Sequence, residues 1–164
     1  MDYYTDYNTD VLWFPIADNL KEFLKTYINQ DGTPLFSDML NYEDIDIGIG
    51  SKGTARAVYP CLEILFDSEE KGVIHTKVKE GITNLWLDCY ISDNTTLELI
   101  PDINQREMFL FQKNILKVMK DWQNHIQTTL HLKTIIAING IISDGDTNLP
   151  LLMSRIMLEI KWKK

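Results

Sequence analysis

The segment GIGSKG, at residues 48–53, carries the glycine spacing of a dinucleotide-binding loop, which makes it the first candidate for a chemical role. In such a site a helix follows the glycines, and its N–H groups and dipole face the pyrophosphate. Here the glycines are followed by TARAVYPCLEILF, which has the composition of a strand. Lys52 also precedes Gly53, and the phosphate-loop sequence GK[ST] does not occur. We therefore interpret the segment as a hinge or the tip of a hairpin.

The segment DGDTN, at residues 144–148, has the spaced oxygen atoms with which a calcium-binding loop begins. The glycine of such a loop is replaced by Leu149, however, and its bidentate acidic residue by Arg155, so a tight polar turn is the better interpretation. The histidines form no pair with the spacing of zinc ligands: they are His75, His125 and His131. The sequence thus predicts no metal site and no cofactor.

Three acidic residues, Glu63, Asp88 and Glu159, lie in the middle of segments that we expect to be strands. Paired carboxylates on neighbouring strands could perform general acid–base catalysis. We favour the alternative, in which these charges point to water from the wet face of an antiparallel sheet. The nucleophile motif G-x-S-x-G does not occur. We therefore do not expect an enzyme.

A chain of 164 residues fits one domain. Its formal net charge of −8 argues against general affinity for nucleic acid, which depends on Lys and Arg, but does not exclude a surface that DNA passes without binding. The cysteines, Cys61 and Cys89, lie in predicted strands, and we expect two buried, reduced thiols rather than a disulfide. The acidic N-terminus is unlike a signal peptide, and no segment is apolar enough to span a membrane. These features predict a cytosolic protein or one assembled from a cytosolic pool.

Two segments have the apolar spacing of amphipathic helices. The first follows Asp18, which is placed to cap it, and residues 1–17 before it are expected to form a tyrosine-rich arm. The second is expected to be one long helix within residues 102–127, a rod of roughly 35 Å.

Period-2 alternation and β-rich composition predict the strands, and polar clusters predict turns at residues 67–72 and 143–150. Residues 30–56 are expected to form a long loop with one short strand at its end. The expected strands cover residues 45–49, 59–66, 73–81, 82–91, 132–142 and 154–164, with a bulge near Gly81 as an alternative that would join two of them. Residues 18–164 are thus predicted to be a single α+β domain, in which the N-terminal helix and the long central helix pack on one antiparallel or mixed sheet.

Aromatic residues share a predicted strand face with a charge. Trp86, Asp88 and Tyr90 lie opposite the apolar face of Leu85 and Leu87. Exposed aromatic strips commonly mark interaction surfaces, whereas packing against the N-terminal arm is the alternative. The terminal segment SRIMLEIKWKK has a second mixed face, with Met157 between two charged residues.

The order of these elements resembles that of the tail terminator, or tail completion, proteins of long-tailed bacteriophages. The likeness covers about residues 18–164: a leading helix, a glycine-containing loop, AVYPCLEILF, TNLWLDCYI, a long helix, an SDGD turn and SRIMLEIKWKK at the end. It implies an α+β subunit that forms a hexameric ring on the tail tube, ends tail growth and joins the tail to the neck of the head. The implied partners are further copies, the tail tube protein, the neck or connector protein and, in a contractile tail, the sheath.

The resemblance also implies a virion protein that is assembled in the host cytoplasm, with DNA passing through its lumen. We expect an exposed terminal strand and the glycine loop to provide the edges that close the ring. The candidate assembly surface is therefore Trp86, Asp88, Tyr90, Arg155, Met157, Glu159, Lys161, Lys163, Ile45, Ile47, Ile49 and Lys52. The alternatives are a head-side neck or connector protein, a small enzyme and a dimeric interaction domain.

Overall fold

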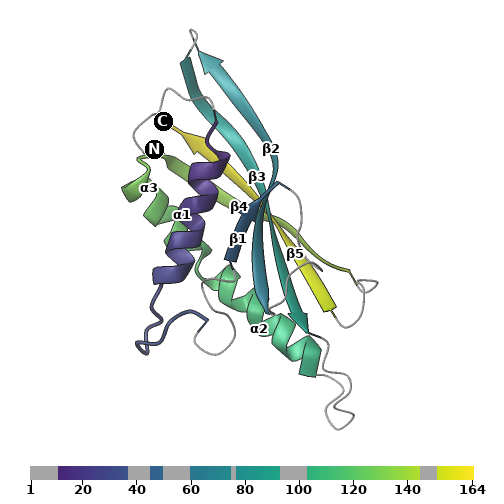
Figure 1. Ribbon diagram of the computed structural model, residues 1–164. Coiled ribbons are helices and arrows are strands. Elements are labelled where there is room, and N and C mark those ends of the chain that lie inside the picture. Colours follow the sequence, from purple (N-terminus) through teal and green to yellow (C-terminus); the bar gives the residue numbers. More distant parts are fainter. Residues whose placement is uncertain (1–10, 37–44, 50–59, 75–76, 93–102, 145–150) are drawn as a thin grey trace.

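The computed structural model describes residues 11–36, 45–49, 60–74, 77–92, 103–144 and 151–164. These residues form two layers, because one mixed sheet of five strands is covered on one face by three helices (Figure 1). The predicted α+β fold with a single sheet is thereby confirmed.

The last strand of the chain lies inside the sheet. The strand order is β1-β2-β3-β5-β4, so β1 and β4 form the two edges among the described strands. β1 runs parallel to β2, and the other neighbouring strands are antiparallel. The strands are β1 (Ile45–Gly48), β2 (Cys61–Ile74), β3 (Lys77–Ser92), β4 (Lys133–Asp144) and β5 (Leu151–Lys163).

All three described helices lie on the same face of the sheet (Figure 1): α1 (Trp13–Thr26), α2 (Ile103–Lys117) and α3 (Met119–Thr129). Alternate strand residues point to that face. Ile64, Leu87 and Ile156 lie side by side on three neighbouring strands and are fully buried. Phe111 of α2 and Trp122 of α3 belong to the same buried cluster. The core therefore fills the space between the sheet and the helices.

Asn19 joins α1 to α3 within this core. Its amide oxygen accepts a hydrogen bond from the indole N–H of Trp122 at 3.1 Å, and its amide nitrogen donates to Thr129 Oγ1 at 2.8 Å. Asn19 and Trp122 are both buried. Because buried polar groups are costly without partners, these bonds determine how the two helices are placed relative to each other.

A chain of hydrogen bonds joins β5 to the start of α1. The indole N–H of Trp162 donates to Thr83 Oγ1 at 2.9 Å, and the Thr83 hydroxyl donates to Glu69 Oε1 at 2.8 Å. The same carboxylate accepts the backbone N–H of Leu12 at 3.2 Å. A negative charge here also interacts favourably with the positive end of the helix dipole. Glu69 of β2 thus supplies the acceptor that the first turn of α1 needs.

The predicted start of the first helix is wrong, because α1 begins at Trp13 and not near Asp18. Asp18 lies inside the helix and does not cap it. The buried face continues upstream through Ile16 and Ala17, and Pro15 is tolerated because it lies in the first turn. Residues 13–17 therefore belong to the domain and not to an arm, and residues 1–10 lie outside the described part.

The predicted long central helix is two helices, separated at Val118. Val118 has φ −100° and ψ −1°, which departs from the typical helical values of about −63° and −42°. Its N–H bonds to the carbonyl of Ile115, three residues back, at 3.3 Å. The break lets Ile115 and Trp122, on either side of it, both be fully buried against a twisted sheet.

The predicted turn at residues 67–72 is also wrong, because these residues continue β2 beside β3. The register shifts that bend this pair lie at Phe66/Ser68 and at Gly72/Val73, and not at Gly81. Residues 77–92 form one continuous strand. The acidic and lysine residues of this segment have the composition of a turn. Polarity alone does not show that their backbone pairs with β3.

Gly81 is required by close packing. It pairs with Trp162 across β3 and β5. A Cβ atom at Gly81 would lie 2.4 Å from Trp162 Cζ2 and 2.5 Å from the carbonyl oxygen of Glu70. The glycine therefore makes room for the ring that donates to Thr83.

We predict that Gly81→Ala destabilises the protein by about 1–3 kcal/mol, because the Trp162 ring and the Glu70 backbone must both move. The free energy of unfolding in urea measures the effect. Gly140→Ala is the matched control, since its Cβ would meet only the flexible end of Met157, at 2.8 Å. Equal losses in the two variants would contradict the packing role of Gly81.

Candidate assembly surface

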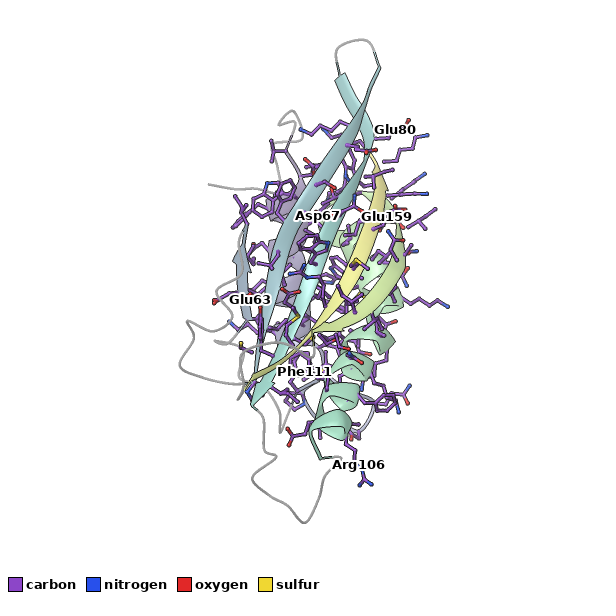
Figure 2. The ribbon with its side chains drawn as sticks, turned by 90° about the vertical axis from the view of Figure 1, so that its right-hand side faces the viewer. Glu63, Asp67, Glu80, Arg106, Phe111 and Glu159 are labelled. Atoms are coloured by element: carbon purple, nitrogen blue, oxygen red, sulfur yellow. The ribbon has the colours of Figure 1, made fainter. Side chains whose placement is uncertain are left out.

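The sheet has an open face, which we define as the face opposite α1, α2 and α3. In Figure 2 the sheet lies in front of the helices, so this face is toward the viewer. The residues of the open face on the central strands include Trp86, Asp88 and Tyr90 on β3 and, on β5, Arg155, Met157 and Glu159. The sequence-predicted mixed faces of these two strands are therefore brought together.

Asp88 and Arg155 lie opposite each other on β3 and β5 and form a two-point ion pair. Arg155 Nε donates to Asp88 Oδ1 at 2.7 Å, and Nη2 donates to Oδ2 at 2.8 Å. The Arg155 guanidinium carbon also lies 3.9 Å from the centre of the Trp86 ring, a cation–π contact. The hydrogen bonds to Asp88 raise the pKa of Arg155, against the opposing effect of burial, so Arg155 stays charged.

The prediction that the mid-strand acids point to water is wrong for two of the three. Glu63 is 1% exposed and Asp88 is fully buried. Asp88 can be buried because the Arg155 fork neutralises its charge and fills its lone pairs. Glu159 agrees with the prediction, because it is partly exposed and lies 3.5 Å from the ammonium group of Lys161.

Exposure along the open face changes with position. Tyr90 is buried, with 3% of its surface exposed, and Trp86 is partly buried beneath Arg155. Lys161 and Lys163, near the end of β5, are exposed. The aromatic strip is therefore largely closed, and the lysine end of the face is accessible to a partner.

The residues predicted around the glycine loop separate into three groups. Ile45 is fully buried and cannot be an exposed contact, which corrects the prediction, whereas Ile47 is partly buried and packs against the core. Ile49 is 73% exposed. Lys52 lies outside the described residues. The predicted short strand is present as β1, and its pairing with β2 places Ile45 and Ile47 on the face that the helices cover.

The expected free edge is also in a different place. β5 pairs with β3 along one side and with β4 along the other, so the terminal strand offers no free edge. β4, by contrast, is the last strand in the sheet order among the described residues. Its 12 residues make an edge of roughly 40 Å.

β4 presents isoleucines on both of its faces. Their exposed fractions are 66% for Ile135, 43% for Ile138, 44% for Ile141 and 50% for Ile142. Beside Ile141 is a groove of about 440 Å³, also lined by Phe109 and Leu116 of α2. The sequence predicts this strand but not the exposure of its isoleucines. The adjacent isoleucine pairs at 135–136 and 141–142 were the available signal, because a half-buried strand has only one apolar face.

A hollow of about 650 Å³ lies at the lysine end of the sheet. Its lining alternates between charged and apolar side chains. Trp162 and Ile135 provide apolar surface, and four lysines and two glutamates surround them: Lys71, Lys133, Lys161, Lys163, Glu70 and Glu80. No histidine or cysteine is among the residues that line it.

Both cysteines are buried and free, as predicted. Cys61 pairs with Tyr90 and Cys89 with Leu62, so the two thiols are one residue out of register and point to opposite faces. Burial raises the pKa of the Cys89 thiol well above its usual value, which makes it a poor nucleophile. The ring centre of His125 lies 5.2 Å from that of Phe23, with the two rings tilted by 43°, and His131 is exposed.

No helix in the described part of the chain is long and apolar enough to cross a membrane. The described residues also contain no group of three or more His, Cys, Asp or Glu that could hold a metal ion. A comparison with models of known protein families finds no match, and a search of curated proteins finds none either. The geometry of the sheet is therefore the basis on which a function can be proposed.

We predict that Asp88→Asn destabilises the protein by about 3 kcal/mol, because it leaves the Arg155 guanidinium partly buried without its counter-charge. Urea unfolding provides the measurement. Glu159→Gln is the control on the same face: its ion pair with Lys161 is exposed, and its loss should change stability by less than about 0.5 kcal/mol. A loss for Asp88→Asn no larger than that of the control would contradict the role given to the buried pair.

Proposed function

We propose that the protein is a structural assembly subunit of the tail terminator type, which forms a hexameric ring on the phage tail tube. The observation that carries the proposal is the outer edge of β4, which no described strand covers and which is 12 residues long and lined by exposed isoleucines. In this role the ring ends tail growth and joins the tail to the neck of the head. The protein would act by binding other chains and not by catalysis.

The free edge of β4 has the properties of a joining surface. An unpaired strand presents a row of N–H and C=O groups that another strand can bond. Monomeric proteins usually protect such an edge with charges, proline or a short strand, but β4 has its charged residues only at its two ends and contains no proline. Exposed isoleucines on both faces would gain further from a partner, because their burial removes apolar surface from water.

The remaining features support a platform that holds its shape. The ion pair of Asp88 and Arg155 joins β3 to β5 on the open face, and the bond from Trp162 to Thr83 joins the same strands on the helix side. The net charge of −8 would keep DNA from binding to the lumen of the ring. The expected partners are further copies, the tail tube protein, the neck protein and, in a contractile tail, the sheath. The protein would be assembled in the host cytoplasm and carried in the virion.

The experiment adds the purified protein to the tail tube protein of the same phage while tubes polymerise. We predict shorter tubes that end in a sixfold ring, observed by cryo-electron microscopy. The double variant Ile135→Lys/Ile142→Lys should leave the tubes uncapped, because charges would replace the apolar edge. Val11→Lys, at an apolar residue that is 50% exposed and lies beside β2, is the matched control and should still cap tubes.

Uncapped tubes with the unchanged protein would contradict the proposal. Binding to the isolated head neck with no binding to tubes would instead support a head-side connector. Capping by the β4 double variant would show that the edge is not the joining surface.

A further inference from the structure

We propose that, in the free protein, β4 pairs with β4 of a second copy, antiparallel and around a two-fold axis. The two sheets of five strands would then form one continuous sheet of ten. This inference concerns the state before assembly, and it rests on the proposed function only in one respect: the pairing would occupy the edge until the ring forms.

The order of residues in β4 is self-complementary. The strand reads KTIIAI followed by NGIISD, so a two-fold axis between residues 138 and 139 places like chemistry opposite like. Isoleucines lie opposite isoleucines, the hydroxyl residues lie opposite each other, and so do the two small residues. At the ends, residues of opposite charge are paired. The pairs are Ile135 with Ile142, Ile136 with Ile141, Thr134 with Ser143, Ala137 with Gly140 and Lys133 with Asp144, each with the second copy.

An irregularity in β4 brings the paired residues onto the same face. Residues opposite each other in an antiparallel pair share a face, whereas residues 135 and 142 of a regular strand would point to opposite faces. The register with β5 shifts between Ile138 and Gly140, which inserts one residue. As a result, Ile135 pairs with Lys161 and Ile142 with Arg155, both on the open face. The five matched pairs thus agree in three dimensions as well as in sequence, and the central pair, Ile138 with Asn139, lies at the irregularity.

The exposed apolar surface lies where this pairing would cover it. Ile135 and Ile142 would be covered on the open face, and Ile141 would cover Ile136 of the second copy on the helix side. The groove beside Ile141 continues this surface onto α2, where Phe109 is 60% exposed. Four of the large exposed apolar residues of the described chain belong to β4 itself: Ile135, Ile138, Ile141 and Ile142.

The length of the two edges favours a second β4 over the other edge of the sheet. β1 has four residues, of which Ile45 is fully buried in the core. Pairing β1 with β4 would therefore leave most of the 12-residue edge open. Pairing β4 with itself satisfies the edge over its whole length and matches opposite charges at both ends.

Cysteine cross-linking tests the register. Ile135→Cys and Ile142→Cys are made as separate proteins, mixed, and treated with a short bifunctional thiol reagent. We predict a cross-linked dimer in the mixture and none with either variant alone, because equivalent residues would be roughly 24 Å apart. The unmodified protein controls for Cys61 and Cys89, which are buried. Absence of the mixed cross-link would overturn the proposed register.

Sedimentation tests the contact without cross-links. We predict a dimer for the unmodified protein and for Val11→Lys. For Ile135→Lys/Ile142→Lys we expect weaker association, with a dissociation constant raised roughly a hundredfold, since each change occurs twice in a two-fold interface. Circular dichroism checks that the variant is folded.

A monomer at every concentration, or a dimer unaffected by the double lysine variant, would overturn the inference. Capping of tubes by a protein that is monomeric in solution would overturn it and leave the proposed function intact. A β4 dimer that never caps tubes would contradict the proposed function and leave this inference intact.

Discussion

The position of β5 between β3 and β4 determines which parts of the sheet are closed and which are open. Thirteen residues of β5 pair along β3 and eleven along β4, so the final strand has hydrogen-bonding neighbours on both sides. Chain ends usually fray unless they are held. Here β5 is held between two strands. The outer strand on that side of the sheet is therefore β4, which precedes β5 in the sequence. The candidate joining surface follows from this order.

Two polar contacts hold β3 and β5 together from opposite faces. On the open face the Asp88 carboxylate binds Arg155 at two points, and on the helix side Thr83 accepts the indole N–H of Trp162. The second contact extends through Glu69 to the start of α1, so the helix layer is connected to the same place. Directional contacts of this kind resist sliding between strands, which apolar packing alone would permit. A sheet held in this way, with a long β4 edge that no described strand covers, is well suited to joining other chains.

The sequence was sufficient for the fold class because alternation and helical spacing reflect burial on one face, which holds whatever the strand order. It was insufficient for the edge because strand order depends on long-range pairing. The acids show the same limit: the environment of Asp88 depends on Arg155, which is 67 residues away. The start of the first helix was predicted wrongly for a related reason. The acceptor at the start of α1 is Glu69 of β2, and no side chain next to the helix in sequence caps it. The adjacent isoleucines of β4 can be read from the sequence. That they are exposed at the edge of the sheet can be seen only from the order of the described strands.

The central claim is that the outer edge of β4 binds another copy of the chain. Hydrogen–deuterium exchange at high and low protein concentration tests this claim directly, because backbone amides that bond to a second copy are protected only while the pair exists. The account predicts that amides of Lys133–Asp144 exchange more slowly in the concentrated sample, whereas those of Ile45–Gly48 do not change. Exchange in β4 that is the same at both concentrations would contradict it.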